Sequence, residues 1–407
     1  MSQPPSSPST ETEISDAGSE SSTIVWGHEP FDSFRNRVLE LAQTLWATSS
    51  TDDIEIERMA GGGFNRVIGI SRKVSGHEER EQYVLRVPRF DAAKLDRDVA
   101  ALYFVSQLGG IPIPDVVFFD ETPDNKLDLP FMVQNRISGT GLISVFPTLE
   151  DDAKCQIASE LGHVFRRMLS AKNSAAGLLG LPPNSKSSET RSRDVIILPL
   201  YEAEHLEPDL AATPSVYNDT LDLLETSFNA RKADEMKTRP TATLTSKMTD
   251  QFITMASELD ADGWFKDVPF SLCHLDLAPR NILVGAAADG LGTTITAVLD
   301  WDSAILAPSF MSCAPPLWVW AWLDDDDEDE RTANNTPATE QGKALKTAFE
   351  EAAGPEYVRY AYSPAYRLSR RLVRFAVDGI RSNEHFREAE SMLQEWAESR
   401  EALKSTR

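Results

Sequence analysis

The sequence predicts an α+β protein with two lobes, a strand-rich N-lobe and a mostly helical C-lobe. The chain has 407 residues, more than one ordinary domain, and 41% of them are hydrophobic, enough for a substantial core. Runs rich in β-branched and aromatic residues predict strands at 54–59, 67–70, 83–87, 111–119 and 129–137. Apolar residues at helical spacing predict helices at 31–47, 91–107, 148–168, 216–236, 246–259, 364–381 and 384–404.

The domain boundaries follow from composition. Residues 1–23 are rich in Ser, Pro, Thr and Glu and lack large apolar side chains, which predicts a disordered tail at 1–25. The strands then predict an N-lobe at 26–138, and the later helices predict a C-lobe at 139–407. Ser138 and Gly139 follow the last strand and are the expected hinge.

The charge of the chain excludes several classes of partner. Forty basic residues against 64 acidic ones give a formal charge of −24. Nucleic acid and anionic membrane both require a basic patch, so we expect neither as a partner. The chain has no run of about 18 apolar residues and no basic-then-apolar leader, and its three cysteines have no ligand spacing. We therefore expect a cytoplasmic protein, with its oligomeric state open.

Three consecutive glycines lie between the first two predicted strands. A glycine loop inside a hairpin lets backbone N–H groups approach phosphates. The loop lacks the G-K-[ST] of a P-loop, and no helix follows it as the dinucleotide fingerprint requires. We expect it to cover nucleotide phosphates, although an ordinary flexible turn fits equally well. The residues are Gly61, Gly62 and Gly63.

A cation and a carboxylate in the N-lobe are expected to pair. Arg86 lies on the third strand, and Asp98 lies beside the apolar stripe of the following helix. A carboxylate near a buried stripe needs a partner, and Arg86 is the candidate. The alternative is an exposed arginine and a solvated aspartate. At the end of the fifth strand, the backbone from Gln134 to Arg136 is expected to contact an adenine edge.

The most specific pattern is S-L-C-H-L-D-L-A-P-R-N-I-L-V, followed by a polar turn and T-A-V-L-D-W-D. It contains His274, Asp276 and Asn281 as H-x-D-x4-N, with Asp300 at the end of the next apolar run. Asn281 and Asp300 supply the oxygen ligands that Mg²⁺ prefers. Asp276 is a carboxylate that can orient an acceptor and take its proton. His274 is expected to brace the loop. The alternative, polar loop residues by chance, does not explain this spacing.

Three features after Asp302 have a functional and a structural interpretation. Trp318, Trp320 and Trp322 either line a substrate pocket or pack in the core. The seven consecutive acids at 324–330 either form a solvated loop or bind a polycationic substrate. Four arginines of the 364–381 helix form a solvated face or pair with the acidic run; they are Arg367, Arg370, Arg371 and Arg374.

Together these features resemble the aminoglycoside phosphotransferase family, which is related to choline kinases and to the protein kinase fold. The resemblance covers about residues 55–322 and rests mainly on the H-x-D-x4-N and D-W-D motifs. It implies a bilobal, protein-kinase-like fold with a five-stranded antiparallel sheet and ATP between the lobes. It also implies Asp276 as catalytic base, Asn281 and Asp300 as Mg²⁺ ligands, and Arg86 and Asp98 at the cation–carboxylate positions. This chain has Asp98 where the family usually has glutamate.

The function expected from this resemblance is transfer of the ATP γ-phosphate to a hydroxyl, or an amine, of a small molecule. Two alternatives stay open: a pseudokinase that acts as a binding or scaffold module, and an atypical protein kinase. No A-P-E sequence ends an activation segment after Asp302, which disfavours a protein substrate. The sequence does not name the acceptor.

Overall fold

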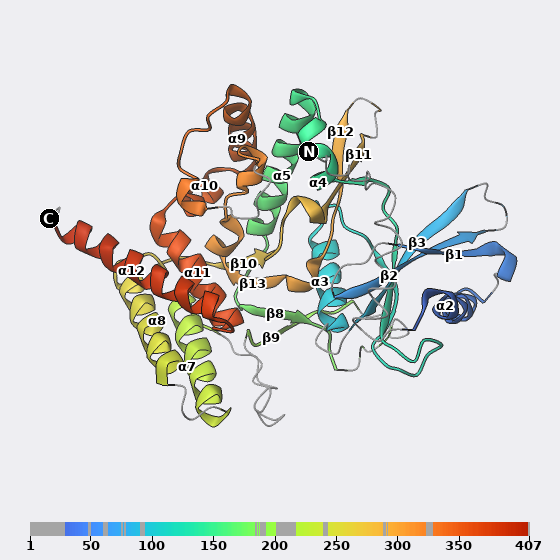
Figure 1. The fold of residues 1–407 in the computed structure, drawn as a ribbon, viewed down its shortest axis with the longest axis horizontal. Helices are drawn as coiled ribbons and strands as arrows, with labels where there is room; N and C mark the ends of the chain where they lie inside the picture. Colours follow the sequence, from blue (N-terminus) through green and yellow to red (C-terminus); the bar gives the residue numbers. More distant parts are fainter. Residues whose placement is uncertain are drawn as a thin grey trace, which may run out of the picture. The chain divides into compact units, whose positions relative to one another are not determined.

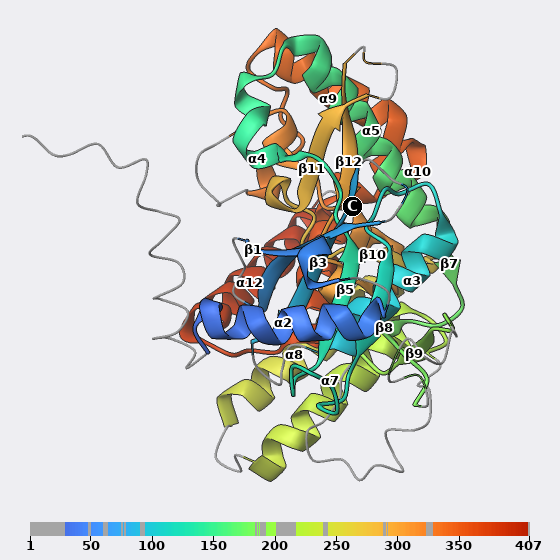
Figure 2. The same cartoon turned by 90° about the vertical axis from the view of Figure 1, so that its right-hand side faces the viewer.

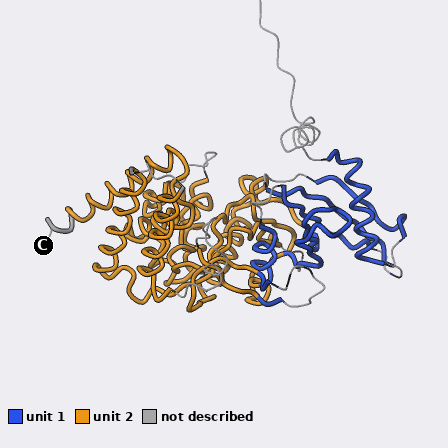
Figure 3. The backbone as a smooth tube through the Cα atoms, turned by 90° about the horizontal axis from the view of Figure 1, so that it is seen from below, with its two compact units in different colours: residues 1–103, 114–137, 181–194 blue, residues 104–113, 138–180, 195–407 orange. Residues whose placement is uncertain are grey.

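The computed structural model describes residues 29–47, 50–59, 64–74, 76, 79–89, 94–183, 185, 187, 193–200, 217–238, 243–287, 290, 292–322 and 329–405. The chain divides into two compact units, drawn in different colours in Figure 3. Unit 1 comprises residues 1–103, 114–137 and 181–194, and unit 2 comprises 104–113, 138–180 and 195–407. The chain leaves unit 1 after Ile137, beside the expected hinge, but 104–113 and 181–194 cross the expected boundary.

Unit 1 contains a five-stranded antiparallel sheet in the order β1-β2-β3-β5-β4. The five predicted strands are confirmed, with different bounds. The fourth is shorter than predicted because Pro112 and Pro114 have no N–H to donate to a neighbouring strand. The strands are β1 Ile54–Arg58, β2 Asn65–Lys73, β3 Arg80–Pro88, β4 Val116–Asp120 and β5 Phe131–Asn135.

Two helices begin in unit 1. The predicted first helix is α2, Phe31–Leu45, which lies across the strands (Figure 2). Its residues Phe34, Val38 and Leu41 are buried in one cluster with side chains of β1, β2 and β3. Burial of this apolar stripe is what holds α2 on the sheet. The second helix is α3, Leu95–Leu108, with Asp98 in its first turn.

The larger unit 2 is mostly helical, so the predicted α+β class is confirmed. Within it, α8 packs against both α7 and α12 (Figure 1). The sequence missed α9 and α10, which pack on each other and on α5. The helices are α4 Leu142–Val145, α5 Asp151–Ser170, α7 Thr220–Thr238, α8 Thr243–Ala261, α9 Glu340–Ala353, α10 Pro355–Ala361, α11 Pro364–Asp378 and α12 Asn383–Ser405.

Two helix ends differ from prediction. The helix predicted from residue 148 begins at Asp151, with Glu150 as the N-cap of α5, and the Thr148 hydroxyl donates instead to the Val145 carbonyl at 2.9 Å. Helix α11 ends at Asp378 rather than at Arg381, because Gly379 follows with φ of 72°. Glycine adopts this left-handed conformation without the steric cost that a Cβ brings.

Two small sheets in unit 2 flank the loop that bears His274, Asp276 and Asn281. One has the order β7-β10-β13-β8-β9, and the other has the order β12-β11-β6. The predicted hairpin is confirmed as β11 and β12, which pair in antiparallel register. The strands are β6 Thr140–Gly141, β7 Lys172–Asn173, β8 Gly177–Gly180, β9 Ile196–Leu198, β10 Phe270–Cys273, β11 Ile282–Ala286, β12 Thr293–Val298 and β13 Ile305–Pro308.

The β11–β12 hairpin also explains the glycine just before β6. A Cβ at Gly139 would lie 2.7 Å from the Thr296 hydroxyl and 3.0 Å from the Val284 carbonyl oxygen. Close packing against the hairpin, rather than a positive φ, therefore requires glycine here. In the described residues, no helix has the length and apolar character needed to cross a membrane.

Candidate active site

The loop after β10 places Asp276 beside Asn281. The Asn281 side-chain amide donates to the Asp276 backbone oxygen at 2.8 Å and to its carboxylate Oδ2 at 2.9 Å. The Arg280 guanidinium donates to the other carboxylate oxygen, Oδ1. The Asp276 side chain is 39% exposed, so the carboxylate is held in place but remains reachable. The sequence analysis missed Arg280, although its position four residues after Asp276 was a usable signal.

His274 connects this loop to the end of β12. Its Nδ1 accepts the Asp276 backbone N–H at 3.1 Å, and its Nε2 lies 2.9 Å from the Leu299 carbonyl oxygen. These contacts assign the proton to Nε2 and leave the ring neutral. Burial lowers the pKa of His274, against the opposing effects of the Leu299 hydrogen bond and the Asp276 and Asp300 charges. Both ring nitrogens are occupied, which is the geometry of a brace rather than of a base.

Asn281 and Asp300 lie at neighbouring points of the hairpin. The Leu299 N–H donates to the Asn281 carbonyl at 2.7 Å, so Asp300 follows directly after this contact. Asp300 has φ of 65° and ψ of 52°, a left-handed conformation that an L residue adopts only at a cost of roughly 1–2 kcal/mol. The next residue, Trp301, is fully buried, donates to the Val298 carbonyl at 3.0 Å and packs against His274. These contacts of Trp301 fix the backbone next to Asp300 and so stabilise its left-handed conformation.

The residues present fit a magnesium ion. The Asn281 amide nitrogen is engaged by Asp276, so its amide oxygen is the atom available to a cation, and Asp300 supplies a carboxylate. Among the described residues there is no group of three or more His, Cys, Asp or Glu side chains that could bind a metal. A two-residue oxygen set suits Mg²⁺, which keeps waters and phosphate oxygens in its remaining positions.

The predicted N-lobe pair is present in unit 1. Arg86 Nη2 lies 3.2 Å from Asp98 Oδ2, and the two side chains are 11% and 4% exposed. The alternative of a solvated aspartate is therefore wrong. The three loop glycines, Gly61, Gly62 and Gly63, lie outside the described residues, so their predicted phosphate contact stays a prediction.

The segment predicted to contact adenine is partly engaged in the sheet. The N–H groups of Asn135 and Arg136 donate to the carbonyls of Asp115 and Gln82, at 3.1 and 2.9 Å. Gln134 is buried and pairs with Val84 of β3 and Val116 of β4, because β5 lies between these strands. The Arg136 side chain pairs with Glu57. Because these N–H groups are already bonded, an adenine contact at this segment would involve its carbonyl groups. This contact stays a prediction.

A cavity of about 780 Å³ in unit 2 adjoins Asp276. Trp318 and Trp322 line it and contact Phe146 at ring distances of 5.7 and 5.4 Å. Trp320 instead packs on Phe349 in the core, at 5.8 Å. Two tryptophans of the series therefore line a cavity, and Trp320 packs in the core; substrate binding in the cavity stays a prediction.

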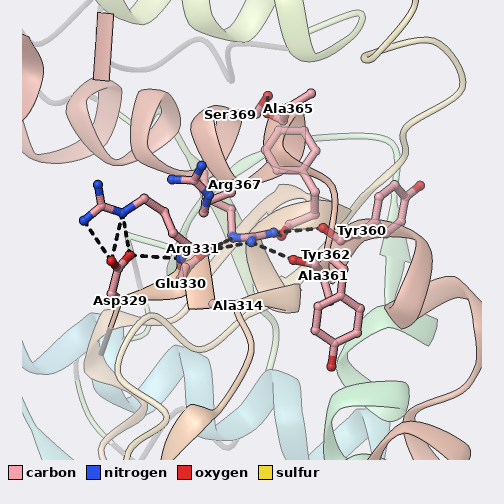
Figure 4. Close-up of polar contacts among 12 residues, drawn as sticks. Ala314, Asp329, Glu330, Arg331, Tyr360, Ala361, Tyr362, Ala365, Arg367 and Ser369 are labelled. Carbon is pink, nitrogen blue, oxygen red and sulfur yellow. Dashed lines mark hydrogen bonds and ion pairs between the residues drawn. The ribbon is translucent and has the colours of Figure 1, made fainter. Parts of the chain in front are cut away.

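The arginines of α11 are not the solvated face that one interpretation expected. Arg370 is 4% exposed, and its guanidinium lies 2.6 Å from the carboxylate of Glu330. Glu330, labelled in Figure 4, ends the acidic run, and its ion pair with Arg370 confirms that the helix and the run are paired at this position. The other acids at 324–328 lie outside the described residues. Arg370, Arg371 and Arg374 line the same cavity as Asp276.

Comparisons with known proteins identify the family of this chain. A model of the phosphotransferase enzyme family matches residues 70–311, more than half of the chain. A subtelomeric hrmA-associated cluster protein of Aspergillus fumigatus is 21% identical over 318 residues, 64% of this chain. The chain spans about 60% of the length of that relative.

Two solved structures are similar over most of the chain. The GDP complex of aminoglycoside 2'-phosphotransferase-IIIa is 16% identical, with 89% of this chain and 97% of that chain covered and a TM-score of 0.45. The choline kinase of Cryptosporidium parvum is 13% identical, with 91% and 97% covered and a TM-score of 0.44. On the family match, which covers residues 70–311, this chain belongs to the phosphotransferase enzyme family.

Proposed function

We propose that this chain transfers the γ-phosphoryl group of ATP to a hydroxyl, or less favourably an amine, of a small molecule. One observation carries the proposal. The Asp276 carboxylate is oriented by Asn281 and Arg280 and opens onto a cavity of about 780 Å³. A positioned carboxylate beside a space of this size suits a base that acts on a small acceptor.

Asp276 performs the proton transfer in this proposal. The acceptor hydroxyl donates a hydrogen bond to the carboxylate and loses its proton as the new oxygen–phosphorus bond forms. The bond between the γ-phosphorus and its bridging oxygen breaks at the same time, which releases ADP and a phosphate ester. The proton then passes from Asp276 to water. Holding the acceptor oxygen in line is the main contribution of the site, since phosphoryl transfer depends chiefly on positioning and electrostatics.

Asn281 and Asp300 would hold Mg²⁺, which offsets negative charge on the phosphate oxygens. His274 links the loop that bears Asp276 to Leu299, the neighbour of Asp300, at 2.9 Å. This hydrogen bond fixes the position of the Asp276 loop relative to Asn281 and Asp300, the proposed ligands of Mg²⁺. In unit 1, Arg86 is assigned to the phosphates, with Asp98 as the partner that orients it. The loop from Gly61 to Gly63 is assigned to the ATP phosphates. The backbone of residues 134–136 is assigned to the adenine.

The test separates the base from the metal ligand. Asp276→Asn should leave Mg-ATP affinity nearly unchanged and lower turnover by roughly 10²–10⁴, the usual contribution of a positioned base. Asp300→Asn removes a charged ligand, so it should weaken Mg-ATP binding as well as turnover. Calorimetry with Mg-ATP and steady-state rates over a panel of hydroxyl-bearing metabolites measure both quantities.

Asp250→Asn is the matched control, because Asp250 lies on α8, is 58% exposed and pairs with Lys232 of α7. It should change neither affinity nor turnover. Equal loss of nucleotide affinity in Asp276→Asn and Asp300→Asn, at unchanged melting temperature, would refute this division of roles. Mg-ATP binding without turnover on any acceptor would favour a pseudokinase.

A further inference from the structure

We propose that the acceptor is an amphipathic molecule with a flat apolar body and an anionic group, and that Arg374 binds this anion. The inference rests on the proposed function, since it concerns the cavity beside Asp276. Three features of this cavity support it: one apolar wall, carboxylates that are already paired with arginines, and the position of Arg374.

One wall of the cavity is strongly apolar. Phe165, Met168, Trp318 and Trp322 line it, and Phe146 stacks on Trp322 and contacts Trp318 edge-to-face. Aromatic faces of this kind bind a ring or another flat apolar group through area burial and stacking. A flat apolar body in the acceptor would therefore match this wall.

The charged wall does not suit a polycation. Four arginines and three carboxylates line the cavity, which gives it a net positive charge in a chain of −24. Each carboxylate already has an arginine partner: Asp276 with Arg280, Glu330 with Arg370, and Glu388 with Arg371. A cationic amine in the cavity would have to displace one of these arginines or lie beside them, and both cost binding free energy.

The described residues of the acidic run, Asp329 and Glu330, also do not favour a polycationic substrate. Glu330 accepts two hydrogen bonds from Arg370, at 2.6 and 3.1 Å. Asp329 is bound by the Arg331 guanidinium (Figure 4), which lowers the pKa of this carboxyl. Both acids are thus engaged with neighbouring arginines, so the polycation interpretation of the run has no support from its described residues.

Arg374 differs from Arg370 in its exposure and in its partners. Its guanidinium donates to the Leu275 carbonyl at 2.7 Å, next to Asp276, and lies 3.8 Å from Asp378. The side chain is 47% exposed, whereas that of Arg370 is 5% exposed and bound to one carboxylate and two close carbonyls. Arginine has five N–H donors in a planar fork, so Arg374 retains donors for a carboxylate. The cation would then hold an anionic acceptor one residue from the base.

The experiment uses matched ligands that differ only in charge. Each member of a panel of hydroxy acids with aromatic or branched bodies, such as 3-phenyllactate, is compared with its methyl ester and with the corresponding amino alcohol. Binding to the full chain is measured by calorimetry with Mg-ADP present, so that no transfer occurs. We expect at least one acid to bind about 10-fold more tightly than its ester, the size of one hydrogen bond to a charged group.

The variants test the assigned cation. Arg374→Ala should lower affinity for the acid about 10-fold and leave ester affinity unchanged, while Arg374→Lys should retain part of the preference. Arg381→Ala is the control, because Arg381 is 68% exposed and lies near the same Asp378 carboxylate without lining the cavity. It should change neither affinity.

The outcomes separate the two proposals. If no acid binds more tightly than its ester and amino alcohol, or if Arg381→Ala has the same effect as Arg374→Ala, the anionic acceptor is refuted. Phosphorylation of the amino alcohols or of an aminoglycoside alone would also refute it, and would leave the proposed function intact. Binding of an acid that depends on Arg374 but is never followed by phosphorylation would support the anion site and overturn the proposed function.

Discussion

The ion pair between Glu330 and Arg370 predicts a specific loss of stability. Glu330→Gln removes the carboxylate charge while it keeps the shape of the side chain and one acceptor oxygen. The Arg370 cation then stays buried, with the Tyr360 and Ala361 carbonyls, at 3.0 and 3.1 Å, as its remaining close acceptors. A buried charge that loses its partner is a well-defined destabilising mechanism.

The expected size follows from the burial of the two side chains. Removing one partner of a fully buried pair costs about 3–5 kcal/mol. Here the Arg370 side chain is 5% exposed but that of Glu330 is 29% exposed, and two close carbonyls continue to solvate the cation. We therefore expect a loss of about 2 kcal/mol in the free energy of unfolding, roughly a 30-fold change in the unfolding equilibrium.

Urea unfolding followed by tryptophan fluorescence measures this loss as a lower midpoint at unchanged slope. Glu340→Gln is the matched control, because Glu340 pairs with Lys343 at 2.7 Å but is 89% exposed. Such an exposed pair contributes little, so the control should stay within about 0.5 kcal/mol of the parent chain. An equally small change in Glu330→Gln would refute the reasoning, since it would mean that water screens this pair as well.

Three further predictions concern other parts of the chain. Arg86→Ala and Asp98→Ala should each raise the KM for ATP, and a double-mutant cycle should give a non-additive result because the pair is buried at 3.2 Å. Additive effects would mean that they act separately. For His274, burial lowers the pKa below its ordinary value of 6.5, so the unfolded chain binds more protons at acid pH. Stability should fall as the pH drops below about 6.5, and more steeply than in His274→Gln, as melting temperatures would measure. Gly162→Ala should lower the free energy of unfolding by about 1–3 kcal/mol, and with it the urea midpoint, despite the better helix propensity of alanine, because its Cβ would lie 2.5 Å from the Phe349 carbonyl oxygen. An unchanged midpoint would contradict this.

Features that depend on the spacing of neighbouring residues along the chain were predictable from the sequence. The strand series, the β11–β12 hairpin and the H-x-D-x4-N loop were all predictable, because side-chain alternation, turn residues and short hydrogen-bonded loops involve neighbours along the chain. The Arg86–Asp98 pair was predictable for a related reason. A carboxylate beside an apolar stripe requires a partner, and the preceding strand offers a cation 12 residues away.

Contacts between side chains that are distant in the sequence could be identified only from the tertiary structure. Arg370 and Arg374 lie four residues apart on α11, yet one is buried against Glu330 and the other lies half-exposed beside Leu275. Trp318 and Trp320 are two residues apart, yet the first lines the cavity and the second packs on Phe349. Helical and aromatic periodicity identifies the faces of an element. The free energy of burying a charge or a ring depends on what packs against that face, and here those partners lie tens of residues away along the chain.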